Sequence, residues 1–130
     1  MFQLIVHEDA KADLKQLAGH DSVSAARIVA LLEEIEGDQD LLDCLTQHDF
    51  GHDRTAGFHV SKWNQLWRAG ADLWRLKAWD LEDKGIRYRV VYAYIPGKQR
   101  YYILGILPRS WNYEKTHPLT KRILSAYELL

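Results

Sequence analysis

The chain has 130 residues, of which 47% are hydrophobic and 27% charged, and its net charge is −1. This composition predicts one globular domain over residues 1–130. No apolar run approaches the roughly 20 residues of a membrane span, and the N-terminus does not resemble a signal peptide, so we expect a cytoplasmic protein without a membrane segment. Cys44 is the only cysteine in the sequence, which excludes an internal disulfide bond.

Charge is unevenly distributed along the chain. Residues 1–53 hold twelve acidic and three basic side chains, a net charge of −9, whereas residues 54–130 hold six acidic and fourteen basic ones, a net charge of +8. Such a separation indicates a basic working surface that the overall charge conceals. Acidic helices that neutralise a basic sheet would give the same pattern, and the two interpretations are compatible.

The first part of the chain predicts a strand followed by helices. Residues 2–6 form a short apolar run suited to a strand, and apolar residues at helical spacing continue from about 9 to 18. A second helix begins at Asp21 or Ser22, both of which are good N-caps, and it ends at Gly37.

Residues 38–71 are interpreted as an extended helix and loop insertion. The segment starts with a third, short helix, but no period persists after it, and several glycines interrupt the pattern. Trp63, Leu66 and Trp67 would form one apolar helical turn, whose tryptophans are either an exposed contact surface or core residues. Long connections of this kind are often functional in compact domains.

Histidines in this insertion raise the question of a metal site. His48, His52 and His59 lie near Asp49 and Asp53 in the sequence. Their spacing fits no structural zinc pattern, and the sequence has no second cysteine. We therefore interpret the segment as a solvated loop and expect no metal.

From residue 72 the hydrophobic pattern changes to a period of two. Residues 72–81, 86–95 and 100–107 predict three strands, joined by short turns. Short connections are typical of an antiparallel meander. The sequence therefore predicts that these strands form one sheet, which the N-terminal strand joins.

The last segment predicts a C-terminal helix. Thr116 or His117 caps it, and Pro118 occupies its first position, where proline is favoured. One face of this helix carries Leu119, Ile123, Ala126, Tyr127 and Leu130.

Alternation assigns the side chains of each strand to two faces. In the first meander strand, Arg75 and Lys77 share a face with Leu73 and Trp79, opposite Trp74. In the second strand, Arg87, Arg89 and Val91 lie opposite Tyr88, Val90, Tyr92 and Tyr94. In the third strand, Tyr102, Leu104 and Ile106 lie opposite Tyr101, Ile103 and Leu107.

The cations of neighbouring strands are expected to gather on one face. Like charges on adjacent strands repel, so this grouping costs stability unless an anion offsets it. Phosphate is the natural anion, because guanidinium groups pair with its oxygens bidentately. Trp79, Tyr101, Trp111 and Tyr113 are suited to stacking on exposed RNA bases. The pattern therefore favours an RNA-binding surface.

Several motifs follow one another in a specific order: WRLK at 74–77, YRVVY at 88–92 after Gly85, and YYILGILPR at 101–109. The N-terminal strand leads into EDAKADL at 8–14, and the chain ends with Asn112-Tyr113-Glu114, His117-Pro118-Leu119, Arg122 and Tyr127. In order and spacing they resemble the RelE/ParE superfamily of type II toxin–antitoxin toxins, and its RelE/HigB-like branch in particular. The resemblance covers residues 2–36 and 72–130.

This resemblance implies a fold and an activity. The implied fold is α+β, with an N-terminal strand and helices packed on an antiparallel three- to four-stranded sheet, and a C-terminal helix. The implied activity is ribosome-dependent cleavage of mRNA without a metal or other cofactor, in which the ribose 2′-hydroxyl attacks the adjacent phosphodiester to give a 2′,3′-cyclic phosphate. The implied partners are mRNA on the ribosome and a cognate antitoxin protein.

The resemblance also implies roles for particular residues. Lys77 is a candidate for proton transfer, Arg89 for stabilising the charge of the transition state, and Arg109 for contact with the scissile or leaving phosphate. Tyr113 is a candidate for base stacking or proton relay. His117 is either an acid–base group or only a helix cap. The implied RNA-binding residues are Arg75, Arg87, Trp79 and Trp111.

Two other functions remain open at this point. A ParE-like chain would inhibit DNA gyrase without cutting nucleic acid, although such chains generally lack the full set of cations found here. A toxin-fold protein that binds RNA with weak activity is also compatible, because the chain is slightly acidic whereas ribosome-directed RelE toxins are generally basic.

Overall fold

The computed structural model describes residues 1–68, 70–111, 113–114 and 116–130; Asn112 of the C-terminal motif lies outside the described residues. Two 3₁₀ turns follow the last two strands, at Pro96–Lys98 and Arg109–Trp111. The helices and strands, in chain order, are β1 (Gln3–Val6), α1 (Glu8–His20), α2 (Ser22–Glu36), α3 (Gln39–Cys44), β2 (Phe58–Lys62), α4 (Asn64–Arg68), β3 (Leu73–Ala78), α5 (Trp79–Asp83), β4 (Tyr88–Ile95), β5 (Arg100–Pro108) and α6 (Pro118–Glu128).

Side-chain caps mark the starts of α1, α2, α3 and α6. Asp21 precedes α2 and accepts a hydrogen bond from the backbone N–H of Ser24, at 3.0 Å. His117 precedes α6 in the same way, and its Nδ1 accepts from the N–H of Leu119 at 3.1 Å, with Pro118 at the first helical position. Each cap satisfies one of the free N–H groups at a helix start. The predicted starts of both helices are confirmed.

The sheet has five strands in the order β1-β5-β4-β3-β2. β1 pairs with β5 in parallel, and all other neighbours are antiparallel. The expectation of an antiparallel sheet of three to four strands is therefore wrong, although the α+β class and the meander are confirmed. The sequence analysis missed β2, whose five residues pair with β3 from Phe58↔Ala78 to Lys62↔Trp74. The alternation that indicates this strand extends over only five residues, and Gly51, Gly57 and Gly70 interrupt the pattern on either side of it, so the signal is weak.

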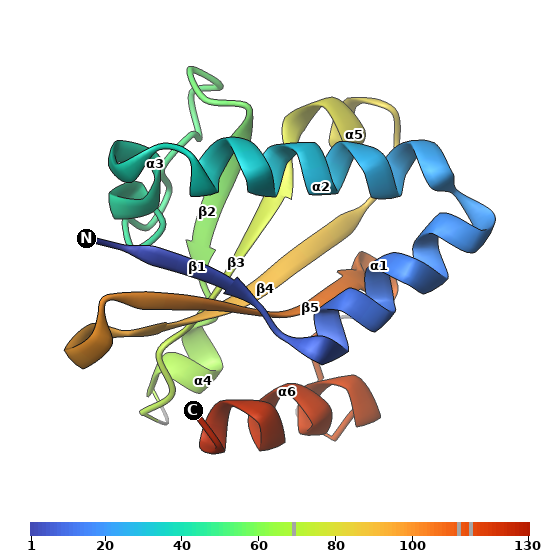
Figure 1. The fold of residues 1–130 in the computed structure, drawn as a ribbon. Coiled ribbons are helices and arrows are strands. Elements are labelled where there is room, and N and C mark those ends of the chain that lie inside the picture. The colour runs from blue at the N-terminus through green and yellow to red at the C-terminus, as the bar shows by residue number, and fades with distance from the viewer. Residues whose placement is uncertain (69, 112, 115) are drawn as a thin grey trace.

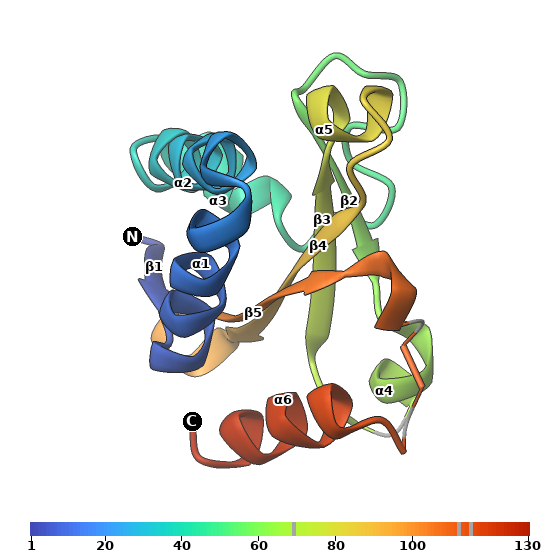
Figure 2. The same ribbon diagram turned by 90° about the vertical axis from the view of Figure 1, so that its right-hand side faces the viewer.

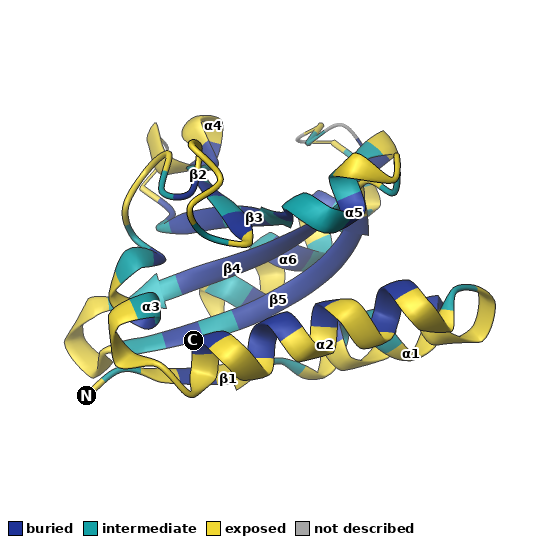
Figure 3. Cartoon of the chain, turned by 90° about the horizontal axis from the view of Figure 1, so that it is seen from above, coloured by how far each residue is buried: buried dark blue, intermediate teal, exposed yellow. Residues whose placement is uncertain are grey.

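The sheet separates two hydrophobic cores (Figures 1 and 2). The first core lies under α1, α2 and α3, and its sheet residues include Trp74, Leu76, Val90 and Tyr92. The second core lies on the opposite face, under α4 and α6. Because both faces are covered, β4 and β5 are buried over most of their length (Figure 3).

A bulge in β5 changes which side chains face each core. Val91 pairs with Gly105 and Tyr92 with Ile103, so Leu104 is an extra residue on β5. Beyond this point the alternation is reversed, as a single inserted residue requires. Ile106 consequently packs in the first core with Tyr101 and Ile103, and Leu107 in the second with Tyr102 and Leu104. The predicted faces of Ile106 and Leu107 were therefore wrong.

The first meander strand is also shorter than predicted. β3 ends at Ala78, and α5 forms where the sequence analysis placed the end of the strand and a turn. Trp63 is buried in the second core rather than exposed, while Trp67 keeps an exposed part. The predicted apolar turn around Leu66 is present as α4.

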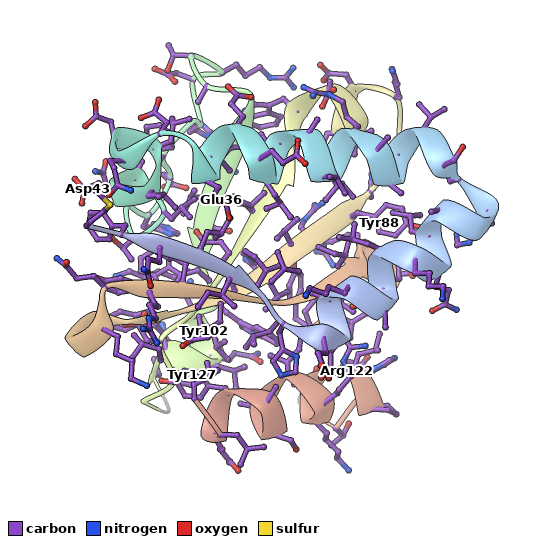
Figure 4. All side chains as sticks on the ribbon, in the orientation of Figure 1. Glu36, Asp43, Tyr88, Tyr102, Arg122 and Tyr127 are labelled. Carbon is purple, nitrogen blue, oxygen red and sulfur yellow. The ribbon has the colours of Figure 1, made fainter. Side chains whose placement is uncertain are left out.

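The C-terminal helix is attached to α1 by an ion pair. Arg122 reaches from α6 toward α1, where its Nη1 and Nη2 lie 2.9 and 2.7 Å from the carboxylate oxygens of Asp13 (Figure 4). The same carboxylate accepts a hydrogen bond from the N–H of Ile106 on β5, at 2.9 Å. This contact holds α1, β5 and α6 together. None of the helices in the described part of the chain has the length and apolarity that a membrane span requires.

Candidate functional site

A cavity of about 330 Å³ lies at the end of the sheet where β3 finishes, β4 begins and β5 finishes. Its walls include the cationic side chains of Arg75, Lys77, Arg89 and Arg109. Trp74 and Leu76 pack in the first core, so the alternating Arg75 and Lys77 place the cavity on the sheet face of the second core. The structure therefore brings together four of the cations that the sequence analysis singled out.

Strand pairing explains why Arg75 and Lys77 enter the same cavity. They are two residues apart on β3, and their neighbours on β2 are Ser61 and His59. Arg75 donates from Nε to the hydroxyl of Ser61 at 2.9 Å. Its guanidinium carbon also lies 4.3 Å from the centre of the Tyr113 ring. The Arg75 side chain is thus held on both sides while part of it faces the cavity.

Arg89 is the most buried of the four cations, with 9% of its surface exposed. Its Nη1 pairs with the carboxylate of Glu82 on α5 and donates to the carbonyl oxygen of Tyr88 at 3.1 Å. An ion pair of this kind orients the guanidinium and offsets part of the repulsion from the neighbouring cations. Glu82 was not identified from the sequence, because only the short helix α5 brings it back toward β4.

Lys77 has an altered proton affinity. Burial lowers its pKa from the ordinary value of 10.5, and the nearby positive charges of Arg89, Arg75 and Arg54 lower it further, whereas Glu82 acts in the opposite direction. Desolvation and like charges both disfavour the ammonium form. Lys77 therefore loses its proton at a lower pH than an exposed lysine does.

Tyr113 closes the cavity on the side of the second core. Its backbone has a φ of 58°, in the left-handed region, and its ring lies 4.2 Å from the ring of Trp111 and 5.5 Å from that of Trp63. Burial raises the pKa of the Tyr113 hydroxyl, although Arg75, Arg89 and Arg109 act in the opposite direction. The hydroxyl makes no hydrogen bond of standard geometry with the described residues.

Three predicted aromatic contacts for RNA are engaged in packing instead. Tyr101 is fully buried in the first core. Trp111 is only 3% exposed and donates from Nε1 to the hydroxyl of Thr120 at 2.8 Å, so it has no open face for a base. Trp79 belongs to α5 rather than to a strand, and donates from Nε1 to the carbonyl oxygen of Gly51 at 2.8 Å. Its ring contacts the guanidinium of Arg54 and the ring of His59.

Two other candidates lie outside the cavity walls. His117 caps α6 and does not line the cavity. Arg87 is exposed and lines a neighbouring surface hollow of about 450 Å³, which shares Arg109 with the main cavity. The two hollows therefore adjoin at Arg109.

The opposite wall of the cavity comes from the insertion, which the sequence analysis treated as a solvated loop. His48, Asp49, His59 and Ser61 all line it. His59 lies on β2, and its Nε2 is 3.2 Å from Oδ1 of Asp49. The loop interpretation is therefore wrong for His59. The alternation of Phe58 and Val60 with His59 and Ser61 was the signal that pointed to a strand.

The arrangement places four cationic side chains beside groups that are able to exchange protons. In the described ranges, no group of three or more His, Cys, Asp or Glu side chains is placed to hold a metal ion. The four cations suit a phosphodiester, and His59 and Lys77 suit proton transfer. Comparison of the chain with models of known protein families gives no match, and neither curated proteins nor solved structures match it significantly.

Proposed function

We propose that this chain is a RelE/ParE-superfamily toxin of the RelE/HigB-like branch, which cleaves mRNA on the ribosome without a metal and thereby inhibits translation. A cognate antitoxin protein would neutralise it in the cell. The single observation that carries the proposal is the convergence of four cations from different strands in one cavity, beside groups that exchange protons.

The arrangement of the elements supports the fold part of this proposal. A strand followed by helices precedes the antiparallel strands β3, β4 and β5, and a C-terminal helix returns to the sheet, as the superfamily resemblance implies. The strand β2 is an addition at the edge of the sheet. It contributes one wall of the cavity, so the insertion is part of the proposed site.

The cavity supports the chemistry. Attack by a ribose 2′-hydroxyl on the adjacent phosphorus needs a base, an acid for the leaving 5′-oxygen, and positive charge near the phosphorane oxygens. Arg89 and Arg109 are assigned to that charge, and Arg75 to the neighbouring backbone. Lys77, with its lowered pKa, is assigned to proton transfer.

Two ring contacts assign Tyr113 to positioning. The guanidinium carbons of Arg75 and Arg109 lie 4.3 and 5.1 Å from the centre of the Tyr113 ring. A ring within reach of two guanidinium groups attracts both by cation–π interaction and so helps to orient them. The uneven charge of the chain is consistent with this site, because the acidic helices α1 to α3 lie on the face of the sheet opposite the cavity.

The proposal is tested by induced expression in a bacterium, with growth and transcript 5′ ends as the measurements. The test variant is Arg75→Ala with Arg109→Ala, and the matched control is Arg100→Ala, which lies at the opposite end of β5 from Arg109. We expect growth arrest and in-frame transcript cuts that disappear in the double variant and persist in the control.

Other outcomes would favour other functions. Growth arrest with DNA breaks and intact transcripts would overturn the nuclease proposal in favour of gyrase inhibition. Normal growth would overturn the toxin proposal and leave an RNA-binding protein of weak activity.

A further inference from the structure

The loop before β2 and the strand itself form a rigid support for two side chains that face the cations. The N–H of Asp49 donates to the carbonyl of Val60, and the N–H of Val60 donates to the carbonyl of Phe50, each at 2.9 Å. Gly51 adopts a φ of +81°, and a Cβ there would lie 1.8 Å from the carbonyl oxygen of Phe58. The loop therefore packs so closely on β2 that only glycine fits.

The ring of His59 is fixed within this support. It is stacked on Trp79 with ring centres 5.6 Å apart and planes at 13°, and Trp79 is itself anchored by its hydrogen bond to Gly51. Strand register places His59 directly opposite Lys77. Only 14% of the His59 side chain is exposed, although it lines the cavity. The imidazole thus has one orientation relative to the cations.

From this geometry we propose that His59, oriented by Asp49, is the general base that accepts the 2′-hydroxyl proton, and that Lys77 is the acid that protonates the leaving 5′-oxygen. The inference rests on the proposed RNA cleavage and assigns its two proton transfers. It gives the insertion a catalytic role that the superfamily resemblance does not cover.

The hydrogen bond to Asp49 selects the useful tautomer of His59. When Nε2–H donates to the carboxylate, Nδ1 carries the lone pair and is able to accept a proton. The carboxylate then stabilises the imidazolium that forms, as the carboxylate of a Ser-His-Asp triad does. Asp49 therefore acts as a positioning residue.

The surroundings of His59 as a whole favour the neutral imidazole. Burial is the main cause that lowers its pKa from 6.5; Asp49 acts in the opposite direction, and Lys77 and His52 lower it further. His48 on the loop and Arg54, which packs on Trp79, also lie beside the dyad, and Arg75, Arg89 and Arg109 line the same cavity. A neutral imidazole at neutral pH is the form that a general base requires.

The proposed step balances in atoms and protons. The 2′-oxygen loses its proton to Nδ1 of His59 and forms a bond to phosphorus, while the bond from phosphorus to the 5′-oxygen breaks. The 5′-oxygen takes a proton from the ammonium group of Lys77. The products are a 2′,3′-cyclic phosphate and a 5′-hydroxyl, and solvent returns the proton from His59 to Lys77.

The test measures single-turnover cleavage by the full chain on ribosomes programmed with a short mRNA. His59→Gln removes the base, and His20→Ala, at the end of α1, is the matched control. We expect His59→Gln to slow cleavage about 100-fold or more, as loss of a general base does, and the control to cleave at the wild-type rate. An unchanged melting temperature and unchanged RNA binding would show that His59→Gln is folded.

A second substrate separates the base from the acid. Sulfur in place of the 5′-bridging oxygen at the cut site is a good leaving group that needs no acid. We expect this substrate to restore cleavage by Lys77→Met but not by His59→Gln. Recovery of both variants, or of neither, would overturn the assigned roles.

The outcomes also separate this inference from the proposed function. Cleavage by His59→Gln within about threefold of wild type, together with loss in the Arg75→Ala Arg109→Ala variant, would overturn the dyad and leave the nuclease in place. Absence of 2′,3′-cyclic phosphate ends with the wild-type chain would overturn both.

Discussion

Glu82 and Arg89 form an ion pair beneath the cationic cavity, with 14% and 11% of their side-chain surfaces exposed. The pair joins α5 to the start of β4, so it fixes both the shape of the connection and the direction of the guanidinium. Asp83, the next residue of α5, forms an exposed pair with Arg54 at 2.8 Å. The two neighbouring pairs therefore differ mainly in burial.

This contrast predicts different costs for two neighbouring substitutions. Glu82→Ala leaves the mostly buried Arg89 without its carboxylate, and we expect it to lower the free energy of unfolding by about 3 kcal/mol. Asp83→Ala should cost about 1 kcal/mol or less, because exposed pairs contribute little. Urea unfolding of both variants checks this, and equal costs would contradict the importance of burial here.

His117 provides a test that separates helix capping from acid–base chemistry. Asparagine caps helices well, so His117→Asn should preserve both stability and cleavage. His117→Ala removes the acceptor for the Leu119 N–H, and we expect it to lower the free energy of unfolding by about 1 kcal/mol without changing the cleaved products. Loss of cleavage in His117→Asn with an unchanged melting temperature would instead assign the proton transfer to His117.

The Tyr113 ring, rather than its hydroxyl, is expected to matter. The pKa of the hydroxyl is raised by burial, so it stays protonated through the neutral range and is a poor base. Tyr113→Phe keeps the ring contacts with Arg75 and Arg109 and should cleave within about threefold of wild type, whereas Tyr113→Ala should lose about tenfold or more. A large loss in Tyr113→Phe would indicate proton relay through the hydroxyl.

The pH dependence of cleavage should be bell-shaped. Activity requires neutral His59 and protonated Lys77, and burial lowers the pKa of both from 6.5 and 10.5. Cleavage should therefore rise as His59 loses its proton below pH 6.5 and fall as Lys77 loses its proton below pH 10.5. Single-turnover rates across this range check the two limbs.

Two variants identify which residue causes the acidic limb of the pH profile and which causes the alkaline limb. His59→Gln should remove the acidic limb, because glutamine does not titrate. Lys77→Arg should remove the alkaline limb, because a guanidinium stays protonated in this range. An acidic limb that persists in His59→Gln would assign it to another group.

Much of the local structure follows from the sequence alone. Alternation correctly separated Arg75 and Lys77 from Trp74 in β3, because side chains of a strand must alternate whatever its partners are. The cap at Asp21 and the proline that starts α6 were also predictable, since each satisfies or avoids a free N–H within a few residues. The cationic wall of the cavity was therefore predictable from the sequence.

Only the tertiary structure decided how distant segments meet. The parallel pairing of β1 with β5, the edge position of β2 and the bulge at Leu104 depend on pairing between segments that the chain does not place side by side. The same pairings bury Trp111 and bring His59 and Asp49 to Lys77. Local periodicity predicts which face of the sheet a side chain occupies. Packing of the whole chain decides which other segment lies against that face.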